Sequence, residues 1–142
     1  MTVRVTRSFE FEVPGERVWE FIADPAKRAA AVSVVERFEL GEGGDATWHV
    51  RLPVPVVDAT IAVETEEVER DPPHHVKFVG TSRAMRVVGE HTVRETASGC
   101  ELVNEFVVDG RLPGVERFFK ERLDTELDNL EAALRRDLEL PA

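Results

Sequence analysis

The sequence predicts an α+β fold in which seven antiparallel strands form a curved sheet around one long C-terminal helix. Residues 112–138 carry apolar side chains spaced by threes and fours, which is typical of a helix with a single buried stripe. The residues before them mostly alternate between apolar and polar, with short turns in between, which is typical of strands. A helix of about 26 residues spans roughly 39 Å, and only a large curved sheet offers one helix that much apolar surface.

The C-terminal helix has sequence signals at both ends. Pro113 stands in its expected first turn, and Arg135 and Arg136 stand in its last turn before Pro141. We expect its first half to face a cavity and its second half to seal the sheet. The predicted buried stripe consists of Val115, Phe118, Phe119, Leu123, Leu127, Leu130, Leu134 and Leu138.

The N-terminal region predicts one strand followed by two short helices. Residues 3–13 alternate as a half-buried strand does, and a Pro-Gly pair ends them. A short helix is expected at 16–23. Asp24 then has the pattern of an N-cap with Pro25 at the first helical position, which starts a second short helix that ends near residue 31.

Six further strands are predicted, and pairing them as hairpins tests which face each residue occupies. A hairpin closed at 96–99 places apolar residues opposite each other and His91 opposite Asn104. The strand beginning at residue 57 fits less well, and we expect a bulge near Glu67. The strands are expected at 33–40, 45–52, 57–69, 75–80, 85–95 and 100–109. The expected pairs are Val93–Leu102, Gly89–Phe106 and Val87–Val108 in the last hairpin, and Leu52–Val57, Val50–Ala59 and Trp48–Ile61 around a turn at 53–56.

Composition excludes several classes of partner. The 142 residues suffice for one domain with a core, and the formal net charge of −10 disfavours nucleic acid and anionic membrane surfaces. No stretch approaches the ~18 apolar residues of a membrane span, and no signal peptide opens the chain, so we expect a cytoplasmic protein. The single cysteine, Cys100, allows no intramolecular disulfide. The acidic composition fits either a high-salt cytoplasm or an ordinary acidic protein.

The chain resembles the START-like superfamily, also called SRPBCC, which includes polyketide cyclase and lipid-transfer branches. Residues 13–25 (VPGERVWEFIADP) look like the first strand-to-helix element of that family, and residues 127–131 (LDNLE) are similar to its closing helix motif. Residues 69–73, Gly80 and Gly89 look closest to the branch of small accessory proteins of carbon monoxide dehydrogenase. The resemblance implies a helix-grip fold. It does not imply one activity, because this fold supports many functions.

Polar residues on the apolar face are the best candidates for ligand contacts, because burying them costs free energy unless a partner satisfies them. His91 and Asn104 either anchor a ligand or simply bind each other. Glu36 and Arg7 also fall on this face, where an ion pair between them is conceivable. Large apolar side chains that would line a pocket or fill the core include Trp48, Met85, Phe106, Phe118 and Phe119.

These residues favour a protein that binds a hydrophobic small molecule, lipid-like or aromatic, in a cavity of a few hundred Å³ at least. The alternatives are a cyclase or dehydratase that uses His91 as general base, and an accessory factor resembling those of carbon monoxide dehydrogenase. We expect no cofactor and no metal, since no His or Cys residues fall at ligand spacing. A homodimer or a protein partner is left open.

Overall fold

The computed structural model describes residues 2–52 and 60–140. Over these residues the chain forms seven strands and three helices in the predicted order. The elements are β1 (Thr2–Phe11), α1 (Gly15–Ile22), α2 (Pro25–Ala30), β2 (Val35–Leu40), β3 (Ala46–Arg51), β4 (Thr60–Asp71), β5 (His75–Thr81), β6 (Met85–Thr96), β7 (Gly99–Gly110) and α3 (Val115–Asp137).

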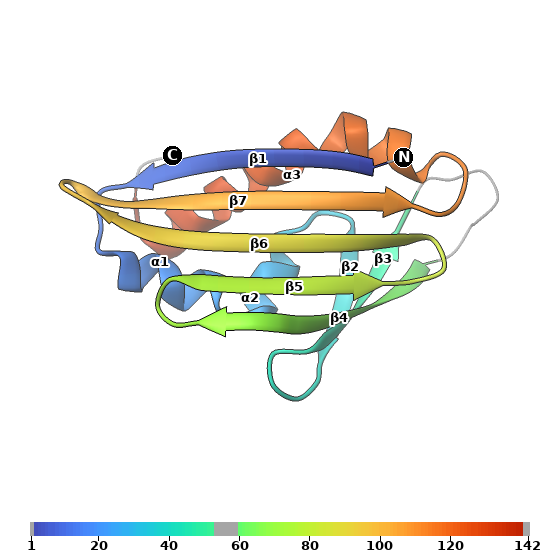
Figure 1. Ribbon diagram of the computed structural model, residues 1–142, viewed down its shortest axis with the longest axis horizontal. Coiled ribbons are helices and arrows are strands. Elements are labelled where there is room, and N and C mark those ends of the chain that lie inside the picture. The colour runs from blue at the N-terminus through green and yellow to red at the C-terminus, as the bar shows by residue number, and fades with distance from the viewer. Residues whose placement is uncertain (1, 53–59, 141–142) are drawn as a thin grey trace.

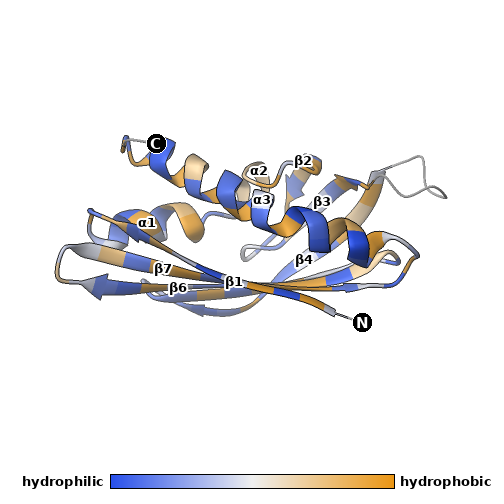
Figure 2. Cartoon of the chain, turned by 90° about the horizontal axis from the view of Figure 1, so that it is seen from above, coloured by the Kyte–Doolittle hydropathy of each residue, from blue (hydrophilic) through white to orange (hydrophobic). Residues whose placement is uncertain are grey.

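All seven strands belong to one antiparallel sheet with the order β1-β7-β6-β5-β4-β3-β2. The first strand pairs with the last, so both lie at the same side of the sheet (Figure 1). Seen from above, the helices all cover one face of the sheet, and α3 crosses that face along its length (Figure 2). The predicted α+β fold, a curved sheet against a long terminal helix, is therefore confirmed.

The predicted register is right in one hairpin and shifted in the other. The β6–β7 pairs, including His91 with Asn104, occur as predicted. Trp48 lies opposite Val63 rather than Ile61, and Val50 lies opposite Ile61 rather than Ala59. A slip of two residues keeps every side chain on its own face, so the alternation of apolar residues cannot detect it. The predicted turn at 53–56 and the Leu52–Val57 pair involve residues outside those described.

Bulges break the alternation in two strands. The expected bulge near Glu67 is confirmed, because the β4–β5 register shifts between Glu67 and Glu69. A second bulge, between Val35 and Arg37 of β2, was not foreseen. It leaves Glu36 exposed, where its side chain pairs with Arg51, so the predicted inward position of Glu36 is wrong.

Arg7 does not pair with Glu36. Its guanidinium reaches α3 instead, where one nitrogen lies 2.7 Å from a carboxylate oxygen of Asp128 and another donates to the carbonyl of Asp124. The conceivable Glu36–Arg7 ion pair is therefore wrong. Arg7 helps to hold β1 against the long helix.

The helix ends follow their local sequence, with one correction. The Asp24 side chain accepts hydrogen bonds from the backbone of Ala26 and Lys27, as predicted for the N-cap of α2. The long helix begins at Val115, three residues later than expected, after Gly114 with φ 92°. Pro113 therefore precedes the helix. The positive φ suits glycine because it lacks a Cβ.

Two apolar clusters fill the space between sheet and helices. One surrounds Phe78, Trp48 and Phe119 and contains the first half of α3, while the other contains Leu127, Leu130 and Leu134 from its second half. The expected division of α3 is therefore present in its packing. Within the described residues, no helix is both long and apolar enough to cross a membrane.

Candidate functional site

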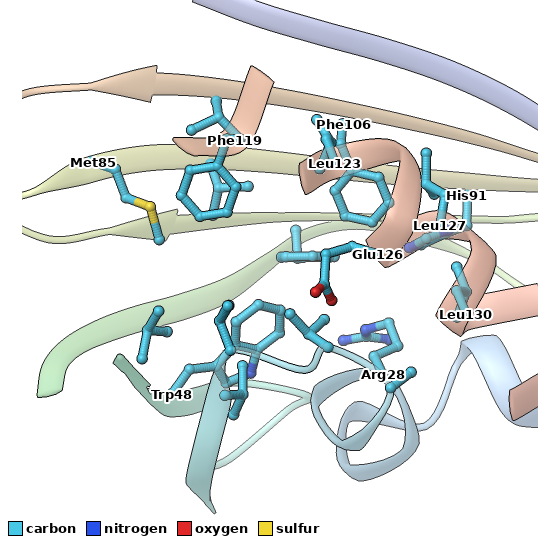
Figure 3. Close-up of a pocket in the computed structure, with 18 of the residues that line it drawn as sticks. Arg28, Trp48, Met85, His91, Phe106, Phe119, Leu123, Glu126, Leu127 and Leu130 are labelled. Carbon is cyan, nitrogen blue, oxygen red and sulfur yellow. The ribbon is translucent and has the colours of Figure 1, made fainter. Parts of the chain in front are cut away.

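The first cluster encloses a pocket whose walls come from the sheet, α3 and the segment after α2. The pocket and its surroundings have an empty volume of about 730 Å³ when the solvent at the mouth is included, but only about 60 Å³ admits the centres of water-sized spheres. This room is less than the few hundred Å³ expected. The lining consists of Ile22, Arg28, Ala31, Val32, Val34, Val35, Trp48, Val50, Phe78, Met85, Val87, His91, Phe106, Val108, Phe119, Leu123, Glu126, Leu127 and Leu130 (Figure 3).

Five of the seven candidate ligand residues border this pocket. They are Trp48 on β3, Met85 and His91 on β6, Phe106 on β7 and Phe119 on α3. Asn104 and Phe118 are not part of its lining. Asn104 lies behind His91, and Phe118 is half-buried with its ring edge-on to that of Phe119, at 5.0 Å between centroids.

Asn104 fixes the orientation and the tautomer of His91. Its side-chain nitrogen donates to the carbonyl of Arg7 at 3.2 Å, so its side-chain oxygen faces Nδ1 of His91 at 2.8 Å. That oxygen can only accept, and Nδ1 of His91 must therefore carry the proton. Nε2 of the neutral ring is left as an acceptor, and it has no hydrogen-bond partner among the described residues.

The surroundings of His91 keep it uncharged. Burial lowers its pKa from 6.5 to about 4, the charges of Arg28 and His75 act in the same direction, and the Asn104 hydrogen bond opposes them. The rings of Phe78 and Phe106 lie 6.3 Å and 5.5 Å from the imidazole. At neutral pH the site therefore presents a hydrogen-bond acceptor and no positive charge at this position.

A buried ion pair, which the sequence analysis missed, forms another part of the wall. Arg28 of α2 donates through Nη2 to Glu67 of β4 at 2.9 Å and through Nη1 to the carbonyl of Ile22 at 2.9 Å. Both side chains are almost fully buried, at 6% and 4% exposed. Arg70 also donates to Glu67. The one sequence signal was the expected bulge at Glu67, which turns that carboxylate toward α2.

A second missed contact closes the pocket between α3 and the segment after α2. Glu126 of α3 is buried and borders the pocket, and its carboxylate accepts hydrogen bonds from both the backbone nitrogen, at 2.8 Å, and the hydroxyl of Ser33. Figure 3 shows the Glu126 carboxylate directed toward the side of the pocket that holds Arg28 and Trp48. Glu126 falls on the buried stripe of the helix, where an acidic residue between Leu123 and Leu127 was the available signal.

The described residues contain no group of three or more His, Cys, Asp or Glu side chains that could hold a metal ion. Cys100 is buried, and burial raises the pKa of its thiol, which favours the unreactive protonated form. The chemistry available at this site consequently comes from the apolar walls, from Nε2 of His91, and from the few polar groups of Arg28, Trp48 and Glu126.

An antiparallel sheet gripping a long helix over an apolar pocket defines a class of small-molecule-binding folds. The family model described as polyketide cyclase / dehydrase and lipid transport matches residues 2–135. The chain belongs to this family, and the predicted START-like resemblance is confirmed. The narrower likeness to accessory proteins of carbon monoxide dehydrogenase is not confirmed.

Solved structures with the same fold include biosynthetic proteins. A conserved protein from Geobacillus kaustophilus is similar at TM-score 0.77 and 14% identity, with 96% of this chain and 95% of that chain covered. The ZhuI aromatase/cyclase from Streptomyces sp. R1128 is similar at TM-score 0.74 and 18% identity, covering 96% and 94%. The di-domain ARO/CYC StfQ of the steffimycin biosynthetic pathway has TM-score 0.74 and 10% identity, covering 97% and 51%. Comparison with curated proteins gives no match.

Proposed function

We propose that this protein binds a hydrophobic small molecule in the pocket between its sheet and α3. The observation that carries the proposal is an apolar pocket inside the core, bordered by Trp48, Phe78, Phe106 and Phe119. Aromatic walls favour a ligand with planar, apolar parts, because rings gain from offset or edge-on contacts beyond the area they bury. A packed core normally leaves few voids larger than a water molecule, so a retained opening of this kind supports a binding role.

Ligand entry requires the walls to move apart. The room for water-sized spheres, about 60 Å³, is below the roughly 150 Å³ of an engineered cavity that binds benzene. Ala31, Val32, Val34 and Val35 border the pocket and are only half-buried, so they form its side nearest to solvent. We place the entrance at this segment, where the hydrogen bonds between Ser33 and Glu126 hold it to α3.

The test is a fluorescence titration with the apolar dye N-phenyl-1-naphthylamine. We expect saturable binding by the native protein, at least tenfold weaker binding by Val34→Trp, and unchanged binding by Val68→Trp. Val34 borders the pocket, whereas Val68 is 47% exposed and is not part of its lining, which makes the two substitutions a matched pair. Absence of saturable binding, or equal binding by both variants, would contradict the proposal. Native mass spectrometry of freshly purified protein then identifies any molecule retained by the native chain but lost from Val34→Trp.

An enzyme of the cyclase or dehydratase type is the second candidate, favoured by the unpaired Nε2 of His91 on the pocket wall. A neutral imidazole can accept a proton, but a conjugate acid with a pKa of about 4 makes it a weak base near neutral pH. An enzymatic role therefore requires a substrate whose proton is unusually acidic or a pKa that rises on binding. Unchanged turnover of any substrate by His91→Ala would eliminate the histidine as the base.

A further inference from the structure

Two buried hydrogen-bond donors at the pocket have no acceptor. Among the buried side-chain nitrogen and oxygen atoms of the described residues, Nε of Arg28 and Nε1 of Trp48 are the ones without a partner. Both residues border the pocket and are 6% exposed. An unsatisfied buried donor costs about 1–3 kcal/mol, and most native structures avoid it. Two such atoms beside the same pocket therefore require an explanation.

The two donors are held in place around one ring. The guanidinium carbon of Arg28 lies 5.3 Å from the centre of the Phe78 ring, and the Trp48 ring centre lies 5.5 Å from it. Hydrogen bonds to Glu67 and to the carbonyl of Ile22 fix the guanidinium, so Nε cannot turn toward another acceptor without breaking them. Trp48 is fixed by its place on β3, with β2 and β4 on either side.

The charges around the donors favour a neutral acceptor. The positive charge of Arg28 is already matched by the Glu67 carboxylate at 2.9 Å, and Glu126 adds a second carboxylate to the pocket wall. An anionic ligand would be repelled by these carboxylates and would lose its hydration on entering an apolar pocket. A carbonyl or ether oxygen accepts a hydrogen bond without bringing a charge.

We propose that Nε of Arg28 and Nε1 of Trp48 form the polar end of the ligand site and bind a neutral oxygen acceptor on an otherwise apolar ligand. This inference rests on the proposed function, because it assigns a chemical feature to the ligand of the same pocket. It also identifies Arg28 and Trp48 as determinants of specificity: a ligand without an oxygen at this end leaves both donors unpaired.

The test uses two probes of nearly the same shape, 2-acetylnaphthalene and 2-isopropenylnaphthalene, which differ in a C=O against a C=CH₂ group. In ¹⁵N-labelled native protein, we expect the ketone to move the indole N–H resonance of Trp48 downfield and the alkene to leave it nearly unchanged. The resonance is identified by its absence in Trp48→Phe, since Trp19 is the other tryptophan. This measurement needs no variant to bind, so it stands even where a substitution disturbs the fold.

The second measurement is calorimetric affinity in Trp48→Phe, which removes the N–H and keeps an aromatic ring. We expect the ketone to bind about fivefold more weakly and the alkene to bind as before. The control Phe119→Leu changes an apolar wall and is expected to affect both probes by the same factor. The ratio between probes decides the outcome, because the alkene leaves water more readily than the ketone whatever the site offers.

A third probe, 2-naphthoate, tests the preference for a neutral ligand and is expected to bind at least tenfold more weakly than the ketone at pH 7. Ketone binding without a change at the Trp48 indole, or an equal loss of both neutral probes in Trp48→Phe, overturns the inference and leaves the proposed function standing. Tighter binding of 2-naphthoate overturns the neutral preference. Failure of every probe, together with failure of N-phenyl-1-naphthylamine, overturns the proposed function itself.

Discussion

At the scale of single residues, His91 combines a buried position with a titration near the physiological range. The folded protein holds its pKa at about 4, whereas an unfolded chain has a histidine pKa near 6.5. Between these values the unfolded state binds more protons than the folded state. The free energy of unfolding therefore falls as the pH is lowered through this window.

We predict that the native protein loses about 2 kcal/mol of unfolding free energy to this residue between pH 7 and pH 5. His91→Gln keeps an amide donor for Asn104 but does not titrate, so it should lose less over the same interval. Urea unfolding of both proteins at the two pH values measures the difference, because carboxylates contribute equally to each. Parallel pH profiles would show that His91 does not titrate as its surroundings require.

Gly89 determines where two aromatic walls of the pocket lie. In the sheet it stands between Phe78 of β5 and Phe106 of β7, and an added Cβ would overlap the Phe78 ring and lie 3.0 Å from the Phe106 ring. The missing side chain is what allows both rings to lie over this position.

We predict that Gly89→Ala costs about 1–3 kcal/mol of stability and weakens binding of N-phenyl-1-naphthylamine, because the rings must shift. Gly41→Ala is the matched control, since an added Cβ there meets nothing closer than 3.5 Å. Thermal unfolding and dye titration measure the two effects. Equal stability of the two variants would contradict this role for Gly89.

At the scale of elements, the Arg28–Glu67 pair ties α2 to β4 and so fixes one side of the pocket. Burial by itself would raise the pKa of the Glu67 carboxyl, but hydrogen bonds from Arg70 and Arg28 outweigh it and lower the pKa. Arg70 extends the tie to the end of α1, because it also donates to the carbonyl of Ala23. The short helices are thus attached to the sheet by polar contacts as well as by packing.

We predict that Glu67→Gln destabilises the protein by about 3–5 kcal/mol, since it leaves a buried guanidinium charge uncompensated. The double variant Arg28→Met/Glu67→Met should lose much less than the two single variants together. Glu121→Gln is the control: its pair with Arg117 is exposed and is worth less than about 1 kcal/mol. Chemical unfolding measures all of these proteins, and additive losses would show that the buried pair is not coupled.

At the scale of the whole molecule, the two apolar clusters give the two halves of the long helix different surroundings. Leu123 borders the pocket, while Leu134 is fully buried in the other cluster and is not part of the pocket lining. The same substitution on one helix therefore probes two different environments.

We predict that Leu134→Ala costs about 2–5 kcal/mol and leaves dye affinity unchanged, because it opens a closed cavity away from the pocket. Leu123→Ala should cost less and tighten binding of N-phenyl-1-naphthylamine, because it enlarges a pocket that already has free space. Unfolding and titration experiments on the pair separate core from site. Identical effects of both changes would show that the pocket is not a distinct part of the core.

The sequence predicted the element order, the β6–β7 register and the facing of most strand residues, because local periodicity and turn residues report these directly. It missed the two-residue offset between β3 and β4, since a slip of two leaves the same faces apolar. It also missed the Val35–Arg37 bulge, which exposes Glu36. Five of the candidate pocket residues were brought together as expected, because they share one face of the sheet or helix.

By itself the sequence determined the fold and the apolar character of the interior, since both follow from how apolar residues repeat along the chain. The tertiary structure decided which polar groups meet around the pocket. Arg28, Glu67 and Glu126 come from three elements far apart in the chain, and their contacts depend on a bulge and on helix placement that no local pattern encodes. The same placement leaves the donors of Arg28 and Trp48 without partners inside the core.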